Sequence, residues 1–137
     1  MWKYYAILSA LFAALTAILA KVGIRGISGN VATAVRTFVV LVMAWGIVWI
    51  GGQMKEVRDL SKHNLLFLAL SGIATGLSWI FYFKALETGD VSKVAPIDKL
   101  SVVFAMLLAF VLLKEPADLK TIAGGALVAL GTIVIIW

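Results

Sequence analysis

Cysteine is absent from the 137 residues, and histidine occurs once, as His63. Without cysteine there is no disulfide framework and no thiolate metal site. The sequence also lacks a G-x-S-x-G segment and a glycine-rich loop between a strand and a helix, the patterns that hold nucleophiles or phosphates in many enzymes. We therefore expect no enzyme activity, no catalytic residue, no cofactor and no metal.

Charge is also scarce. Only 14% of the residues are charged, against about 25% in soluble domains, whereas 63% are apolar. The net charge is +5, but the twelve Lys and Arg residues stand singly between apolar runs and form no basic stripe. This distribution argues against nucleic acid as a partner and favours the lipids of a membrane.

Five apolar stretches are long enough to cross a bilayer, which takes about 20 residues. They run over residues 4–20, 31–51, 65–83, 91–113 and 118–137, and short connections join them. Neighbouring helices should therefore be antiparallel. The sequence predicts an all-α membrane protein, a five-transmembrane-helix bundle that forms one domain over residues 1–137.

The fourth stretch has charges inside it. Its uninterrupted apolar run, Leu100 to Leu113, has 14 residues and would reach only about 21 Å. Extending the helix back to Val91 gives a full span and places Pro96, Asp98 and Lys99 at bilayer depth. Pro96 cannot donate its backbone hydrogen bond, which should leave a carbonyl free for a ligand or a water.

Arg36 in the second stretch is predicted to lie at a similar depth to Asp98 and Lys99. Ionisable residues inside a span are costly and usually mark a functional site. In the alternative interpretation, Arg36 and Lys99 extend to the lipid headgroups and Asp98 neutralises one of them.

The third stretch carries a hydroxyl stripe at helical spacing, consisting of Ser71, Thr75, Ser78 and Tyr82. Beside it run Gly72, Gly76 and Trp79. Ser78, Trp79 and Tyr82 are nearest the charged face, and we expect them to line a cavity. Glycines four apart allow close helix packing, which we expect of Gly72 and Gly76, and also of Gly124 and Gly131 on one face of the last helix.

Several short segments resemble the EamA domain of the drug/metabolite transporter superfamily. They are Phe83-Lys84-Ala85-Leu86, Gly89, Ser92 to Pro96, Leu113-Lys114-Glu115, Gly124 and Gly131. The resemblance implies a five-helix repeat that in most relatives occurs twice, with the two copies inverted around a substrate cavity. This chain has one copy, so the second half should come from another subunit. A more distant likeness is to the small multidrug resistance exporters, but the stretch 4–20 has no carboxylate to match theirs.

The resemblance implies a secondary transporter of a small metabolite or drug-like molecule in the bacterial cytoplasmic (inner) membrane. In this hypothesis Asp98 changes its protonation as substrate arrives, and Arg36, Lys99, Ser78, Trp79, Tyr82 and Pro96 contribute to the substrate or coupling site. Two alternatives stay open. One is a lipid-carrier flippase or a flippase subunit, and the other is a membrane scaffold that transports nothing.

Positive charge is nearly balanced across the membrane. The face with the N-terminus has six Lys and Arg residues, and the opposite face has four, or six if Arg36 and Lys99 are counted there. A bias of zero to two charges fixes orientation poorly. Two five-helix copies in opposite orientations would form an inverted repeat. We therefore expect an antiparallel homodimer with dual topology.

Overall fold

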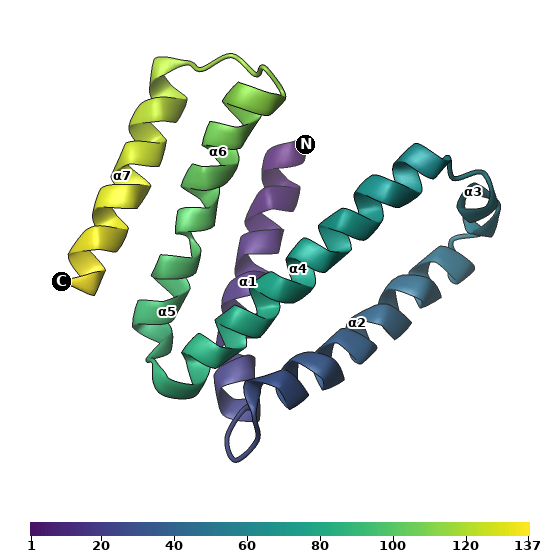
Figure 1. The fold of residues 1–137 in the computed structure, drawn as a ribbon, viewed down its shortest axis with the longest axis horizontal. Helices are drawn as coiled ribbons and strands as arrows, with labels where there is room; N and C mark the ends of the chain where they lie inside the picture. Colours follow the sequence, from purple (N-terminus) through teal and green to yellow (C-terminus); the bar gives the residue numbers. More distant parts are fainter. The chain divides into compact units, whose positions relative to one another are not determined.

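The computed structural model describes residues 1–137 and contains helices but no strand (Figure 1). Five helices are long and apolar enough to cross a membrane. They are α1 (Trp2–Gly23), α2 (Gly29–Ile50), α4 (Lys62–Thr88), α5 with α6 (Val91–Asp98 and Leu100–Leu112) and α7 (Leu119–Ile136), while α3 (Met54–Arg58) is one short turn in a connection. The predicted all-α membrane fold with five spans is confirmed.

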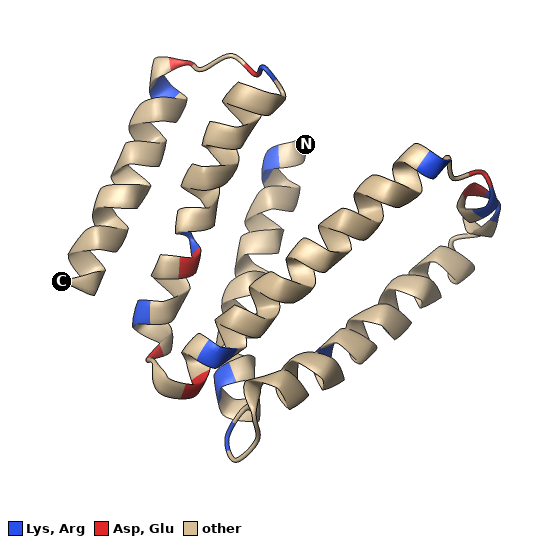
Figure 2. Cartoon of the chain, in the orientation of Figure 1, with Lys and Arg blue, Asp and Glu red and all other residues tan.

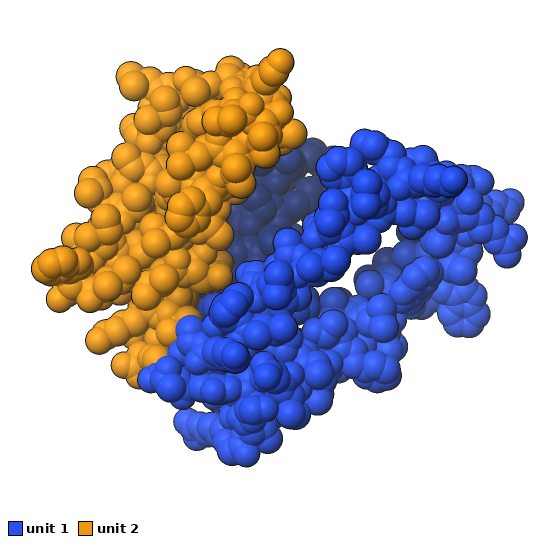
Figure 3. Space-filling view, viewed as in Figure 1, with its two compact units in different colours: residues 1–88 blue, residues 89–137 orange.

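The chain forms two compact units, coloured separately in Figure 3. Unit 1 comprises Met1–Thr88 and contains α1 to α4, in which α4 packs against both α1 and α2. Unit 2 comprises Gly89–Trp137, in which α7 packs against α5 and α6.

The three long helices of unit 1 begin earlier than the hydropathy pattern predicts, and hydroxyl side chains cap two of them, α2 and α4. The Ser28 hydroxyl accepts a hydrogen bond from the Val31 amide (3.4 Å), so α2 begins at Gly29. The Ser61 hydroxyl accepts from the Asn64 amide (3.1 Å) ahead of α4. Such caps satisfy amides that have no partner in the first turn. With 27 residues, α4 is about 40 Å long and exceeds the hydrocarbon thickness.

The fourth span differs from the single helix predicted over 91–113. It is interrupted at Lys99, whose amide reaches the carbonyls of both Ala95 (3.3 Å) and Pro96 (3.0 Å). The Val102 amide then bonds the Lys99 carbonyl (3.0 Å) three residues back. Pro96 lies within α5, and a proline inside a helix removes one backbone hydrogen bond and bends the chain. The span is therefore a pair of short helices.

The buried apolar core is small and lies at one end of unit 1. Its members are Ala17, Ile24, Phe83 and Leu86. They come from the end of α1, the turn that follows it and the end of α4. Two polar contacts reinforce this end: the Lys21 ammonium donates to the Leu86 carbonyl (2.5 Å), and the Gly29 amide donates to the Glu87 carboxylate. A carboxylate at the start of α2 is favoured by the helix dipole.

Gly29 is where α2 comes closest to α4. A Cβ added there would lie 3.1 Å from the Phe83 carbonyl carbon and 3.2 Å from the Lys84 nitrogen, both backbone atoms that cannot rotate away. One turn further along α2, Thr33 is also buried, and its hydroxyl donates to the Gly29 carbonyl (2.7 Å). Small residues thus let the two helix backbones approach each other.

Outside this core, most of the large apolar side chains are exposed. At most 11% of the residues in the apolar part of any span are buried. Figure 2 shows charged residues mainly at helix ends and in connections, with further charge inside α2 and at the α5–α6 junction. An apolar surface flanked by charge is suited to lipid and to further helices.

We predict that Gly29→Ala destabilises the protein by about 1–3 kcal/mol, because the added methyl group presses on the α4 backbone. Gly46→Ala in the same helix is the matched control, since nothing lies within 4 Å of a Cβ at that position. The control should be neutral or stabilising. Unfolding in mixed detergent micelles measures both variants, and equal stabilities would show that the α2–α4 contact is not tight.

Candidate functional site

Arg36 projects from α2 onto the aromatic face of α4. Its guanidinium carbon lies 4.3 Å from the centre of the Trp79 ring and 5.6 Å from the centre of the Phe83 ring. These two aromatic residues are four apart, so they stand on one face of α4. No carboxylate forms an ion pair with the guanidinium, which is half-buried. The aromatic rings therefore hold a cation that has no counter-ion within unit 1.

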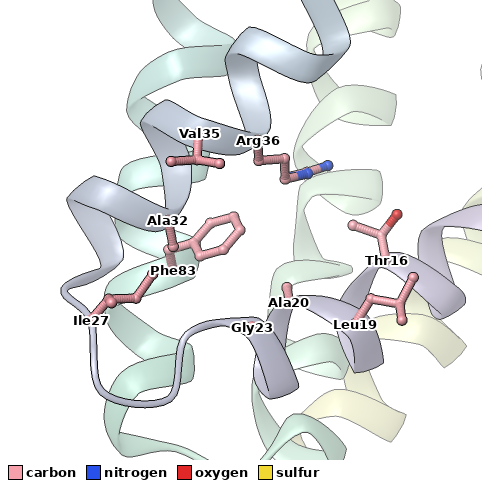
Figure 4. Close-up of a pocket in the computed structure, with 9 residues that line it drawn as sticks. All are labelled: Thr16, Leu19, Ala20, Gly23, Ile27, Ala32, Val35, Arg36 and Phe83. Carbon is pink, nitrogen blue, oxygen red and sulfur yellow. The ribbon is translucent and has the colours of Figure 1, made fainter.

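A pocket of about 370 Å³ lies beside this guanidinium, between α1, α2 and α4. Its lining residues are Thr16, Leu19, Ala20, Gly23, Ile27, Ala32, Val35, Arg36 and Phe83. In Figure 4 the Arg36 side chain and the Thr16 hydroxyl extend into the same space from opposite helices, and the Phe83 ring forms part of another wall. The pocket is thus largely apolar, with one cation and one hydroxyl group.

The composition of this pocket is suited to binding a small molecule rather than to catalysing a reaction. Small-molecule sites are mainly apolar concavities with a few placed polar groups, and their volumes are about 300–1,000 Å³. A guanidinium keeps its charge in proteins and offers five donors in a planar fork. No group in the pocket has the chemistry of a nucleophile paired with a base.

Unit 2 contains the other charged residues that the sequence predicts at bilayer depth, Asp98 and Lys99. The Lys99 ammonium lies 3.3 Å from the Asp98 carboxylate, and the two residues are adjacent at the α5–α6 interruption. Their side chains are 54% and 35% exposed, respectively, so the carboxylate is the more covered partner. The pair therefore stands where the helix is already broken.

The backbone at this interruption is supported by α7. The Thr132 hydroxyl lies 2.9 Å from the Val128 carbonyl and 3.3 Å from the Pro96 carbonyl, and Thr132 is buried. In a membrane, hydroxyl side chains of neighbouring helices commonly serve backbone groups near a proline. The Pro96 carbonyl thus has a hydroxyl partner in the protein.

Comparison with known proteins shows which family the chain belongs to. Residues 1–137 match the EamA-like transporter family. The chain belongs to that family. It is 44% identical over 134 residues to a Sinorhizobium protein named "Uncharacterized transporter in cobO 3'region", covering 98% of this chain and 95% of that protein. No solved structure matches the chain.

The family resemblance predicted from the sequence is therefore confirmed. The EamA chain is a multi-pass membrane transporter of the drug/metabolite transporter superfamily. The match covers the residues of both compact units.

Among the predicted site residues, Arg36 and Trp79 are in direct contact. Tyr82 meets the neighbouring Phe83 edge-on, with ring centres 6.2 Å apart. Ser78 is exposed and does not line the pocket, and the Thr75 hydroxyl of the same stripe donates to the Ser71 carbonyl (2.9 Å). One face of the Trp79 ring is therefore covered by the Arg36 guanidinium of the protein itself.

The predicted packing glycines contact no other helix closely within the chain. Nothing lies within 4 Å of a Cβ at Gly72, Gly76, Gly124 or Gly131. The close contacts are instead at Gly29 and at Gly125, where a Cβ would lie 2.8 Å from the Met106 methyl group. The four predicted glycines remain candidates for contacts with another chain.

Sequence reasoning missed the part of the pocket that α1 provides. Thr16 is a polar residue in a mainly apolar span, and it lies five residues, about one and a half turns, before Lys21. That polar residue was the available signal. Leu19, Ala20 and Gly23 give no signal, because apolar residues of this kind face lipid equally often.

Proposed function

We propose that this protein is a secondary active transporter of a small metabolite or drug-like molecule, coupled to protons and acting as an antiparallel dimer in the bacterial cytoplasmic membrane. The observation that carries the proposal is the pocket of about 370 Å³ beside a guanidinium without a counter-ion inside a membrane span. A charge at such depth is costly and marks a substrate or ion pathway by default.

Substrate binding is assigned to unit 1. Arg36 is the polar contact, and Trp79 and Phe83 fix its guanidinium in place from one side. Thr16 adds a hydroxyl group from the opposite wall. Tyr82 and Ser78, further around α4, are proposed to contact substrate in another state of the transport cycle.

Coupling is assigned to Asp98 in unit 2. Protonation would neutralise the carboxylate and end its attraction to Lys99, at a point where Pro96 and the interrupted helix already weaken the backbone hydrogen bonding. Broken helices at bilayer depth are a recurrent feature of secondary transporters. A change in charge there can shift α5 relative to α6 and so exchange a proton for substrate.

The antiparallel dimer is supported by the small charge bias and by the exposed apolar faces of the helices. The aligned region covers 95% of the Sinorhizobium relative, so that protein is hardly longer than the match. Gly72, Gly76, Gly124 and Gly131 are open surfaces on which a second copy can pack closely. Two copies in opposite orientation complete the inverted repeat.

We predict that Asp98→Asn abolishes proton-linked transport at near-normal expression, since the amide cannot take up or release the coupling proton. A thermal-shift screen of amino acids, organic acids, nucleobases, polyamines and quaternary amines first identifies a ligand, because a ligand that binds only the folded state stabilises it. Uptake of that ligand into proteoliposomes is then measured under a pH gradient. Asp59→Asn, in an exposed connection, is the matched control and should keep full activity. Undiminished gradient-driven uptake by Asp98→Asn would refute the coupling role.

Dual topology predicts that C-terminal fusions to a reporter active only in the cytoplasm and to one active only outside both give signal. Adding three lysines to the connection after α2 should shift the population to one orientation, because positive charge retains a connection in the cytoplasm. If the unmodified chain gives signal from only one reporter, it inserts in one orientation and the antiparallel homodimer is excluded.

A further inference from the structure

Unit 1 contains a second cavity besides the pocket at Arg36. This outer cavity has a volume of about 360 Å³ and is lined by residues 24–28 together with Lys21 and Glu87. Ile27 is the one residue that lines both this outer cavity and the inner pocket beside Arg36. The outer cavity is formed by the connection between α1 and α2, so it lies at the end of the span.

The charged side chains that line these two cavities are mainly positive, and they differ in whether they have a partner within the protein. The Glu87 carboxylate accepts the Gly29 amide, and the Lys21 ammonium donates to the Leu86 carbonyl. Arg25 in the outer cavity and Arg36 in the inner pocket have no ion pair. The outer cavity and the inner pocket thus each contain a guanidinium group without a counter-ion.

The remaining chemistry of the inner pocket restricts the ligand further. Apart from Arg36 and Thr16, the lining side chains are apolar or absent, so a ligand with several polar groups would lose hydrogen bonds on entry. A cationic ligand would be repelled by Arg36, and the Trp79 face that could attract it is already covered. An anionic group would supply the counter-ion that Arg36 lacks.

We infer that the inner pocket binds a small organic monoanion, a carboxylate attached to an apolar body. Its carboxylate pairs with the Arg36 guanidinium through two parallel hydrogen bonds, the bidentate geometry that arginine favours. Its apolar body lies against Leu19, Val35 and Phe83. The inference rests on the proposed transport function and narrows its substrate class.

The test uses the full chain in nanodiscs of phosphatidylcholine and three probes with one carbon skeleton. They are 3-phenylpropionate, its neutral amide 3-phenylpropionamide and the cation 3-phenylpropylamine. Calorimetry or equilibrium dialysis should give tighter binding for the carboxylate than for the amide, by at least about tenfold, and weakest binding for the amine. Equal affinity for the carboxylate and the amide would overturn the inference.

Variants locate the site. Arg36→Gln should reduce carboxylate affinity at least about tenfold and change amide affinity less than about twofold, since only the charged contact is lost. Unchanged amide binding shows that the variant is folded. Arg58→Gln, which removes the same charge from an exposed position in α3, is the control and should bind as the parent does. An equal loss of carboxylate binding in both variants would contradict the assignment to Arg36.

A lipid headgroup is the competing anion. In nanodiscs with phosphatidylglycerol, 3-phenylpropionate should still bind within a few-fold of its affinity in phosphatidylcholine, and complete displacement would assign the site to lipid instead. Flux is measured separately in proteoliposomes. Carboxylate-selective binding without flux would leave the inference standing and refute the transport function. Proton-linked flux of the amine without carboxylate binding would instead support the transport function and refute the inference.

Discussion

The contact between Gly29 and the α4 backbone is the constraint on which unit 1 depends. Because a Cβ at this position would press on backbone atoms of Phe83 and Lys84, only the smallest residue allows the two helices to meet here. The Glu87 carboxylate then caps α2, and Lys21 connects the end of α1 to the same turn of α4. Three helix ends are thereby joined at one end of the unit, while the faces beyond are left for lipid and other helices.

This junction determines where Arg36 can reach. Arg36 lies two turns from Gly29 along α2, and Trp79 lies one turn before Phe83 along α4, so the antiparallel helices bring the guanidinium over both rings. A cation over an aromatic face gains about 0.5–2 kcal/mol, depending on desolvation. This attraction partly offsets the cost of a charge at bilayer depth and leaves the donors of the guanidinium available to a ligand.

The number of spans could be predicted because membrane thickness fixes the length of an apolar helix. The close contacts and the interruptions of these helices depend on residues of neighbouring helices, which the hydropathy pattern does not reveal. Gly29 appears in sequence as one of several turn glycines, and its close approach to α4 becomes visible only when both helices are placed. Likewise Pro96 predicts a weakened helix, but not that Thr132, 36 residues later, supplies a hydroxyl to its carbonyl.

The candidate site was predictable to the extent that charge in a span is rare. Arg36, Asp98 and Lys99 are conspicuous for that reason, and the aromatic partner of Arg36 is among the residues expected at a cavity. The orientation of Arg36 was not predictable, since a flexible side chain of this length reaches either headgroups or a pocket from the same position. In the structure its guanidinium contacts Trp79, and Arg36 is among the residues that line the pocket.

The central claim is that water and small anions reach the pocket beside Arg36, and thiol labelling tests it most directly because the chain has no cysteine of its own. Val35 lines the pocket, whereas Thr37, about 200° further around α2, does not. In membranes open on both sides, Val35→Cys should react with the anionic reagent 2-sulfonatoethyl methanethiosulfonate, and faster than with its trimethylammonium counterpart after correction for their rates with a free thiol. Thr37→Cys should remain unreactive. Equal labelling at both positions, or no labelling at Val35→Cys, would contradict the account.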